Sequence, residues 1–126
     1  GVGGSCDYTC NSMLATFTCG STAKDGKISS IVPFCSHIDH TEHYVDAIVT
    51  EYGVADLRNK SSLEKAEALI AIAHPDYRPI LKEYLRLAGV YGGHTHHVLS
   101  AAFALHDTYR RKGDMRLVDW GEYIRE

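Results

Sequence analysis

The chain of 126 residues has a mass of 13.9 kDa, which suits one domain whose core buries roughly two-thirds of the surface of the unfolded chain. Hydrophobic residues make up 44% and charged residues 23%, a composition that excludes a disordered or collagen-like protein. The net charge of -3 offers no general attraction for a polyanion, so we expect no nucleic-acid partner. The longest apolar run, residues 68–73, is far shorter than the roughly 20 residues that cross a bilayer, so we expect no membrane partner.

Short β-prone runs predict a small sheet in the first half of the chain. Residues 13–18 and 27–32 are two such runs, and an Asp-Gly pair between them tolerates positive φ, which predicts a hairpin that joins them. Residues 44–50 predict a third, buried strand that delivers Glu51 at its carboxyl end. Ligands of open α/β sheets bind beyond the carboxyl ends of strands, so Glu51, Tyr52 and Gly53 form a candidate site position.

Helical patterns dominate the second half. A capping box at residues 61–64 begins a helix that ends before Pro75. A second helix is predicted from about residue 76 to a stop at Gly89, and a third from about residue 97 to 112. We therefore predict one α/β domain over residues 1–126, with a small mixed sheet flanked by helices.

The cysteines lie at positions 6, 10, 19 and 35, all in the first third of the chain, and form no CxxC pair. This spacing fits neither a zinc finger nor a small secreted domain held by disulfides. We expect reduced thiols that pack as small hydrophobic side chains in a cytoplasmic protein. The chain begins at Gly1 without methionine or a secretory signal, so we expect that other sequence precedes it in the native protein.

Five side chains that can bind metals lie close together in the run HIDHTEH at residues 37–43. A catalytic zinc usually takes two ligands one helical turn apart and a third from elsewhere, and no helix signal supports that spacing here. We expect a polar turn without metal. The alternative is a stand-alone metal-binding module that uses His37, Asp39, His40 and His43.

Two other features suit an anion. Residues 1–5 are glycine-rich, and such a turn exposes backbone N–H groups that can receive a phosphate or an oxyanion. Lys24 lies at the tip of the predicted hairpin. Glycine pairs more often simply make tight turns, and a lysine at a loop tip is usually solvated, so the residues alone leave both interpretations open.

Four segments occur in one order along the chain: GVGGSCDY at 1–8, STAKDGKIS at 21–29, SHIDHTEH at 36–43 and TEYGVADLR at 50–58. Together with AHPDYR at 73–78, they closely resemble the C-terminal domain of the acetyl-CoA hydrolase/transferase family. The resemblance extends to about residue 88 and, more loosely, to residue 113. The SHxDHTEH segment is most similar to the succinyl-CoA:acetate CoA-transferase branch.

This resemblance implies the C-terminal part of a two-domain CoA-transferase. Such an enzyme moves CoA between an acyl-CoA, such as succinyl-CoA, and a small carboxylate, such as acetate, through a glutamyl-CoA thioester. The nucleophilic glutamate is expected upstream, in an N-terminal domain absent from this chain, so we expect the chain alone to be inactive. Coenzyme A is the expected cofactor, as the acyl-CoA substrate. An acyl-CoA hydrolase is the alternative, and a homodimer stays open.

The same resemblance implies roles for individual residues. Gly4 falls on the glycine whose backbone amide lines the oxyanion hole, and Gly3, Gly4 and Lys24 are expected to bind CoA. Glu51 falls on a glutamate expected to orient or electrostatically tune the nucleophile, so Gly4 and Glu51 are the expected catalytic residues. Cys10 departs from the family pattern, which commonly has arginine at this position.

Overall fold

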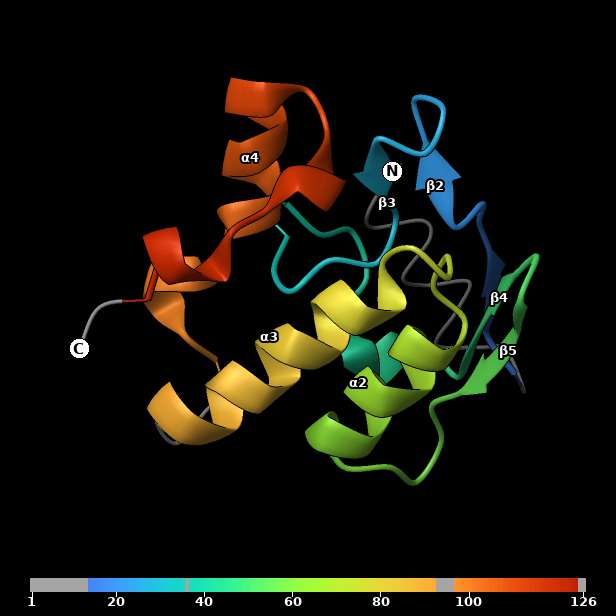
Figure 1. Ribbon diagram of the computed structural model, residues 1–126. Helices are drawn as coiled ribbons and strands as arrows, with labels where there is room; N and C mark the ends of the chain where they lie inside the picture. Colours follow the sequence, from blue (N-terminus) through green and yellow to red (C-terminus); the bar gives the residue numbers. More distant parts are fainter. Residues whose placement is uncertain (1–13, 36, 93–96, 125–126) are drawn as a thin grey trace.

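A computed structural model describes residues 14–35, 37–92 and 97–124 of the chain. Two small sheets lie toward one side of this part of the molecule, and the helices α2, α3 and α4 lie toward the other (Figure 1). The strands come from the first half of the sequence and the helices from the second, which confirms the predicted α/β class.

The larger sheet is mixed and has the strand order β1-β4-β5. The parallel pair joins β1 (Thr16–Thr18) to the central strand β4 (Ala47–Thr50), and β5 (Gly53–Asp56) follows as an antiparallel neighbour. Burial of Ala47 and Thr50 at the two ends of β4 agrees with the strand predicted over residues 44–50. The tight turn after β4 contains Glu51, so this residue lies at the end of a strand, as predicted.

The smaller sheet is a hairpin of β2 (Thr22–Ala23) and β3 (Ile28–Ser29). Its turn has positive φ at Lys24, Asp25 and Gly26, which confirms the turn that the Asp-Gly pair predicts. The predicted pairing of residues 13–18 with 27–32 is wrong, because β1 pairs with β4 instead. A central apolar strand such as β4 needs a neighbour on both edges, and residues from β1 provide the second one.

Helix α2 (Ser62–Ala71) follows the predicted capping box: the Ser61 side chain accepts a hydrogen bond from the Glu64 amide, and the Glu64 side chain accepts one from the Ser61 amide. Helix α3 (Arg78–Tyr91) continues past the predicted stop at Gly89 and ends at Gly92. Glycine costs a helix only about 1 kcal/mol, and the burial of neighbouring Leu87 and Ala88 outweighs that cost.

The third helix is shorter than predicted. A 3-10 turn, η2 (Leu99–Ala101), comes first, and α4 (Ala104–Lys112) then ends at Gly113 in the left-handed conformation. Leu99 and Phe103, which helical periodicity places on the inner face, are 77% and 43% exposed because the chain turns before α4 begins.

One core cluster joins all three helices to the 3-10 turn η3 (Met115–Leu117). Its buried members are Ile70, Ala73, Tyr77, Leu81, Leu105 and Met115. The AHPDYR segment therefore runs through the centre of the fold, and the hairpin residue Ile28 packs against the same cluster.

Two sequence-based expectations about single residues are wrong. Cys19 and Cys35 are exposed rather than buried, and both lie in loops outside the strands and helices. Within the parts of the chain that the structure describes, no helix is long and apolar enough to cross a membrane.

Candidate functional site

Glu51 connects the end of β4 to the base of the hairpin. Its carboxylate accepts a bifurcated hydrogen bond from the single backbone N–H of Ser21, with N···O distances of 2.9 Å to Oε1 and 3.2 Å to Oε2. Ser21 is buried and directly precedes β2, and Lys24 follows at the tip of the same hairpin. The structure thus places two of the predicted site residues, Glu51 and Lys24, on directly linked elements.

The charge state of Glu51 follows from these contacts. Hydrogen bonding from Ser21 is the main cause that holds the pKa of Glu51 below its ordinary value, and nearby His74 contributes in the same direction. The carboxyl group is therefore ionised at neutral pH. It can act through its charge and as an acceptor, but it has no proton to donate as a general acid.

A buried threonine secures the turn that bears Glu51. The Thr50 hydroxyl donates to the Ile72 carbonyl at 2.6 Å and accepts from the Tyr52 amide at 3.1 Å. Thr50 is 5% exposed, and its bond to Ile72 is buried, whereas its bond to the Tyr52 amide is only partly buried. This pair of bonds ties the turn to the end of α2.

Tyr52, which follows Glu51 in the same turn, packs against two residues of the AHPDYR segment. The His74 ring meets the Tyr52 ring edge-on at 5.6 Å, and the Arg78 guanidinium carbon lies 5.3 Å from the centre of that ring. Arg78 is held in place by a hydrogen bond from Nε to the Ala73 carbonyl at 2.9 Å. Sequence reasoning singled out Tyr52 together with Glu51 at the strand end, but it treated His74 as a helix-end residue and did not place Arg78 at the site. The AHPDYR match was the one signal that pointed to this segment.

Lys24 presents its ammonium group to solvent. It occupies the first positive-φ position of the turn, with φ of 52°. The Lys24 side chain makes none of the hydrogen bonds or ion pairs found within residues 14–35, 37–92 and 97–124. An exposed lysine that has no partner in these parts of the chain is available to an anionic ligand.

The glycine-rich turn that contains Gly3 and Gly4 lies outside the described residues. Its predicted convergence with Lys24 and Glu51 stays a prediction.

Cys19 lies beside the site, and its backbone amide donates to the Val49 carbonyl at 3.0 Å. Although Cys19 is exposed as a residue, partial desolvation of its thiol and, to a lesser extent, the negative charge of Glu51 raise the pKa of this thiol. The thiol is therefore protonated and weakly nucleophilic at neutral pH.

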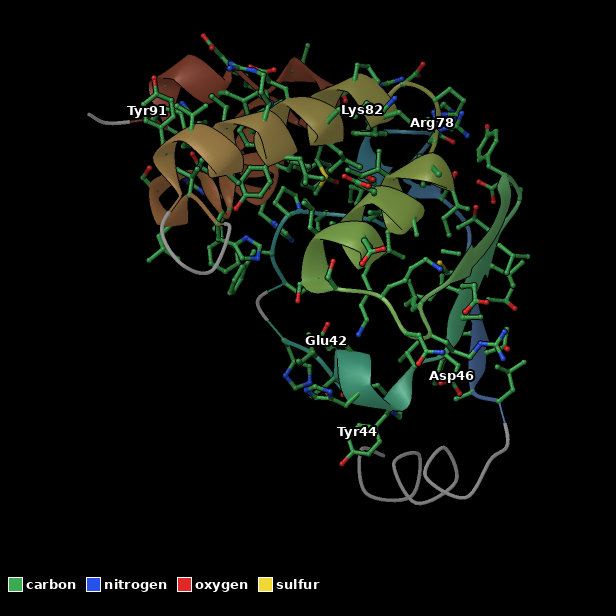
Figure 2. The ribbon with its side chains drawn as sticks, turned by 90° about the horizontal axis from the view of Figure 1, so that it is seen from below. Glu42, Tyr44, Asp46, Arg78, Lys82 and Tyr91 are labelled. Carbon is green, nitrogen blue, oxygen red and sulfur yellow. The ribbon has the colours of Figure 1, made fainter. Side chains whose placement is uncertain are left out.

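The residues of the HIDHTEH run turn to different partners. His37 contacts Asp39 at 3.1 Å, Glu42 pairs with Lys65 of α2 at 3.2 Å, and the His40 ring packs against Phe17. Figure 2 shows Glu42, the first residue of the 3-10 turn η1 (Glu42–Tyr44), well separated from Arg78 and Lys82 of α3. Among the side chains that the structure describes, no three His, Cys, Asp or Glu residues form a group that could hold a metal ion.

Comparison with known proteins identifies the class. Residues 1–85 match the family model described as the acetyl-CoA hydrolase/transferase C-terminal domain, and the chain belongs to this family. This confirms the resemblance carried by the five sequence motifs. Members of the family are CoA-transferases and acetyl-CoA hydrolases, so the chain is part of an enzyme family that acts on CoA thioesters.

Similar proteins include both kinds of enzyme. The chain is 50% identical to a propanoyl-CoA:succinate CoA transferase of Escherichia coli over 116 residues, 91% of this chain and 23% of that protein. It is 51% identical to a succinyl-CoA:acetate CoA-transferase of Clostridium kluyveri over 118 residues, 92% of this chain and 22% of that protein. The chain is 42% identical to an acetyl-CoA hydrolase of Candida glabrata over an alignment of 131 positions, which covers 95% of this chain and 25% of that protein.

A solved structure agrees with the fold. The 4-hydroxybutyrate CoA-transferase of Porphyromonas gingivalis superposes with a TM-score of 0.60 at 42% identity, over 66% of this chain and 22% of that one. The chain thus spans about a quarter of the length of the curated relatives it matches.

Proposed function

We propose that this chain supplies part of the CoA site of a CoA-transferase and works together with an N-terminal domain. The enzyme moves CoA from an acyl-CoA, such as succinyl-CoA, to a carboxylate, such as acetate. A glutamate carboxylate of the N-terminal domain attacks the thioester carbonyl and displaces CoA as its thiolate, which leaves an acyl-glutamyl anhydride. The thiolate then attacks the glutamyl carbonyl, forms the glutamyl-CoA thioester and releases the donor acid as a carboxylate. The acceptor carboxylate attacks this thioester by the same two steps, so a new acyl-CoA leaves and the glutamate is regenerated. The observation that carries the proposal is the bifurcated hydrogen bond from the Ser21 amide by which Glu51 holds the base of the Lys24 hairpin.

In this proposal Lys24 binds an anionic part of CoA and Glu51 acts by position and charge. An exposed ammonium group at a loop tip suits a phosphate, which lysine binds as a point charge. The ionised Glu51 holds the hairpin and adds negative charge beside the nucleophile. Gly3 and Gly4 offer backbone amides to CoA, and the amide of Gly4 stabilises the oxyanion that forms when the thioester carbonyl is attacked.

Sequence identity favours transfer over hydrolysis. The two relatives named as transferases of succinyl-CoA or propanoyl-CoA are 50% and 51% identical to the chain, whereas those named acetyl-CoA hydrolases are 37% to 42% identical. The two reactions share the attack on the thioester and differ in the group that resolves the intermediate. A carboxylate yields a new acyl-CoA, and water yields free CoA.

Product analysis tests the proposal. The whole enzyme, with this chain joined to its N-terminal domain, is incubated with succinyl-CoA with and without acetate, and the thioesters are separated by chromatography. We expect acetyl-CoA and succinate only when acetate is present. Free CoA as the sole thiol product in both samples would identify a hydrolase instead, and the absence of any turnover would refute both activities for these substrates.

The site assignment has its own test. Lys24→Ala is expected to raise KM for the acyl-CoA and to leave KM for acetate unchanged, because only the CoA portion contacts this lysine. Lys82→Ala is the matched control, since Lys82 is also an exposed lysine but lies on α3 and not on the hairpin (Figure 2). Equal KM values in the two variants would contradict the role of Lys24.

A further inference from the structure

The hairpin that bears Lys24 cannot position this residue by itself. Each of its strands has two residues, and an isolated two-stranded hairpin is marginally stable in water. Its turn also has positive φ at two residues that are not glycine, Lys24 at 52° and Asp25 at 55°. Such a conformation persists only where surrounding contacts determine it.

One of these contacts comes from Tyr77 of the AHPDYR segment. The Tyr77 hydroxyl donates to the carbonyl of Gly26, two residues after Lys24, at 2.7 Å. Tyr77 is 0% exposed, and burial, followed by the negative charge of Asp114, raises its pKa to about 12. The phenol therefore stays protonated and acts as a donor throughout the neutral pH range.

The second contact comes from Met115, in the 3-10 turn η3 beyond α4. Its amide donates to the Lys27 carbonyl at 2.8 Å, and its sulfur accepts from the Ser29 amide at 3.3 Å. Met115 is 3% exposed and belongs to the same core cluster as Tyr77. The last strand of the hairpin is therefore held to the helical core.

The end of the turn is also flanked by a charged group. The Arg116 guanidinium lies so close to Gly26 that a Cβ atom there would be 3.5 Å from Nη1. Asp114 pairs with this guanidinium at 2.7 Å and Asp76 at 3.5 Å. Arg116 thus already has two carboxylate partners, whereas Lys24 has none within residues 14–35, 37–92 and 97–124.

We propose that Tyr77 and Met115 are positioning residues for Lys24: they hold the far side of the hairpin, as Glu51 holds its base, and so determine the affinity for CoA. The inference rests on the proposed function, in which Lys24 binds CoA. Neither residue is catalytic, because both act through the hairpin backbone. Met115 also lies outside residues 1–85, which match the family model.

Tyr77→Phe in the whole enzyme tests the inference, because it removes only the hydroxyl that holds Gly26. We expect KM for the acyl-CoA to rise about fivefold, the loss for one hydrogen bond, with kcat unchanged. Tyr109→Phe is the matched control: Tyr109 packs against the same core cluster, and its hydroxyl makes none of the hydrogen bonds seen in the described parts of the chain. Its KM should equal that of the wild type.

Two readouts separate positioning from a general loss of stability. Salt should raise KM less steeply in Tyr77→Phe than in the wild type, because a displaced ammonium neutralises less of the ligand charge. The double variant with Lys24→Ala should have the KM of Lys24→Ala alone, since Tyr77 acts through that lysine. Met115→Leu keeps the volume of the side chain and removes the sulfur acceptor, so it should raise KM for the acyl-CoA by less than Tyr77→Phe does. It takes the place of Tyr77→Phe in this test if that variant does not fold.

The outcomes distinguish the two proposals. A raised KM in Lys24→Ala with an unchanged KM in Tyr77→Phe and Met115→Leu would overturn the positioning inference and leave the proposed function intact. An unchanged KM in Lys24→Ala would refute the role of Lys24 and the inference with it. A lower melting temperature with wild-type KM and salt dependence would show that Tyr77 is only structural, which also overturns the inference.

Discussion

Thr50→Val removes the contact that ties the Glu51 turn to α2. Valine keeps the shape of threonine but replaces the hydroxyl, so the Ile72 carbonyl loses its donor at 2.6 Å and the Tyr52 amide loses its acceptor at 3.1 Å. Tyr52 is 42% exposed, so water can replace the bond to its amide. The cost is then mainly that of one buried, unsatisfied carbonyl, and we expect the free energy of unfolding to fall by about 2 kcal/mol.

Urea denaturation of the 126-residue chain measures this change. With a slope of about 2 kcal/mol per molar urea, the midpoint should fall by about 1 M while the slope stays constant. Thr50→Ser is the matched control, because it keeps both hydrogen bonds and loses one methyl group worth about 0.8 kcal/mol. If Thr50→Val is as stable as Thr50→Ser, the hydroxyl does not stabilise the turn and the reasoning is refuted.

Three further predictions concern local features. Ser61→Ala should lower the unfolding free energy by about 1 kcal/mol in the same assay, because it removes the cap of α2; an unchanged midpoint would contradict the capping role. The pKa of Glu51 is lowered in the folded protein, so the ionised carboxylate and its bond to Ser21 are present above the ordinary pKa of 4.5 and are lost as pH falls through the lower, folded-state pKa. The NMR resonance of the Ser21 amide should therefore titrate with a midpoint below pH 4.5. The same resonance should not titrate in Glu51→Gln. A midpoint at or above 4.5 would show that the hydrogen bonds do not favour the ionised form. Gly89→Ala, in the interior of α3, should stabilise the chain by up to about 1 kcal/mol. Gly113→Ala should destabilise the chain by about 1 kcal/mol, since φ is +77° at this residue. No atom lies within 4 Å of a Cβ added at Gly89 or at Gly113, so the two variants differ in backbone conformation and not in crowding. Equal effects of the two substitutions on stability would contradict this conformational explanation.

Sequence reasoning was most successful where the cause is local. The capping box, the Asp-Gly turn and the buried strand before Glu51 each depend on residues within a few positions of one another. The predicted end of α3 and the predicted start of α4 were wrong. Packing against the core overrode the glycine and the helical periodicity from which these limits were predicted.

The candidate site was predicted in part. Glu51 and Lys24 were singled out, by strand position and by resemblance, and the structure links them through Ser21. Thr50 and Tyr77 were not assigned to the site, because nothing in their neighbouring residues marks a contact with Ile72 or Gly26.

The amino-acid sequence by itself determined the family, the α/β class and the local turns and caps, since these follow from motifs and from interactions between near neighbours. Only the tertiary structure decided that β1 pairs with β4, that the Glu51 carboxylate accepts a hydrogen bond from Ser21, 30 residues away, and that the Met115 sulfur accepts one from Ser29, 86 residues away. Contacts over such separations depend on how a shared core brings the elements together, and no local preference encodes that arrangement.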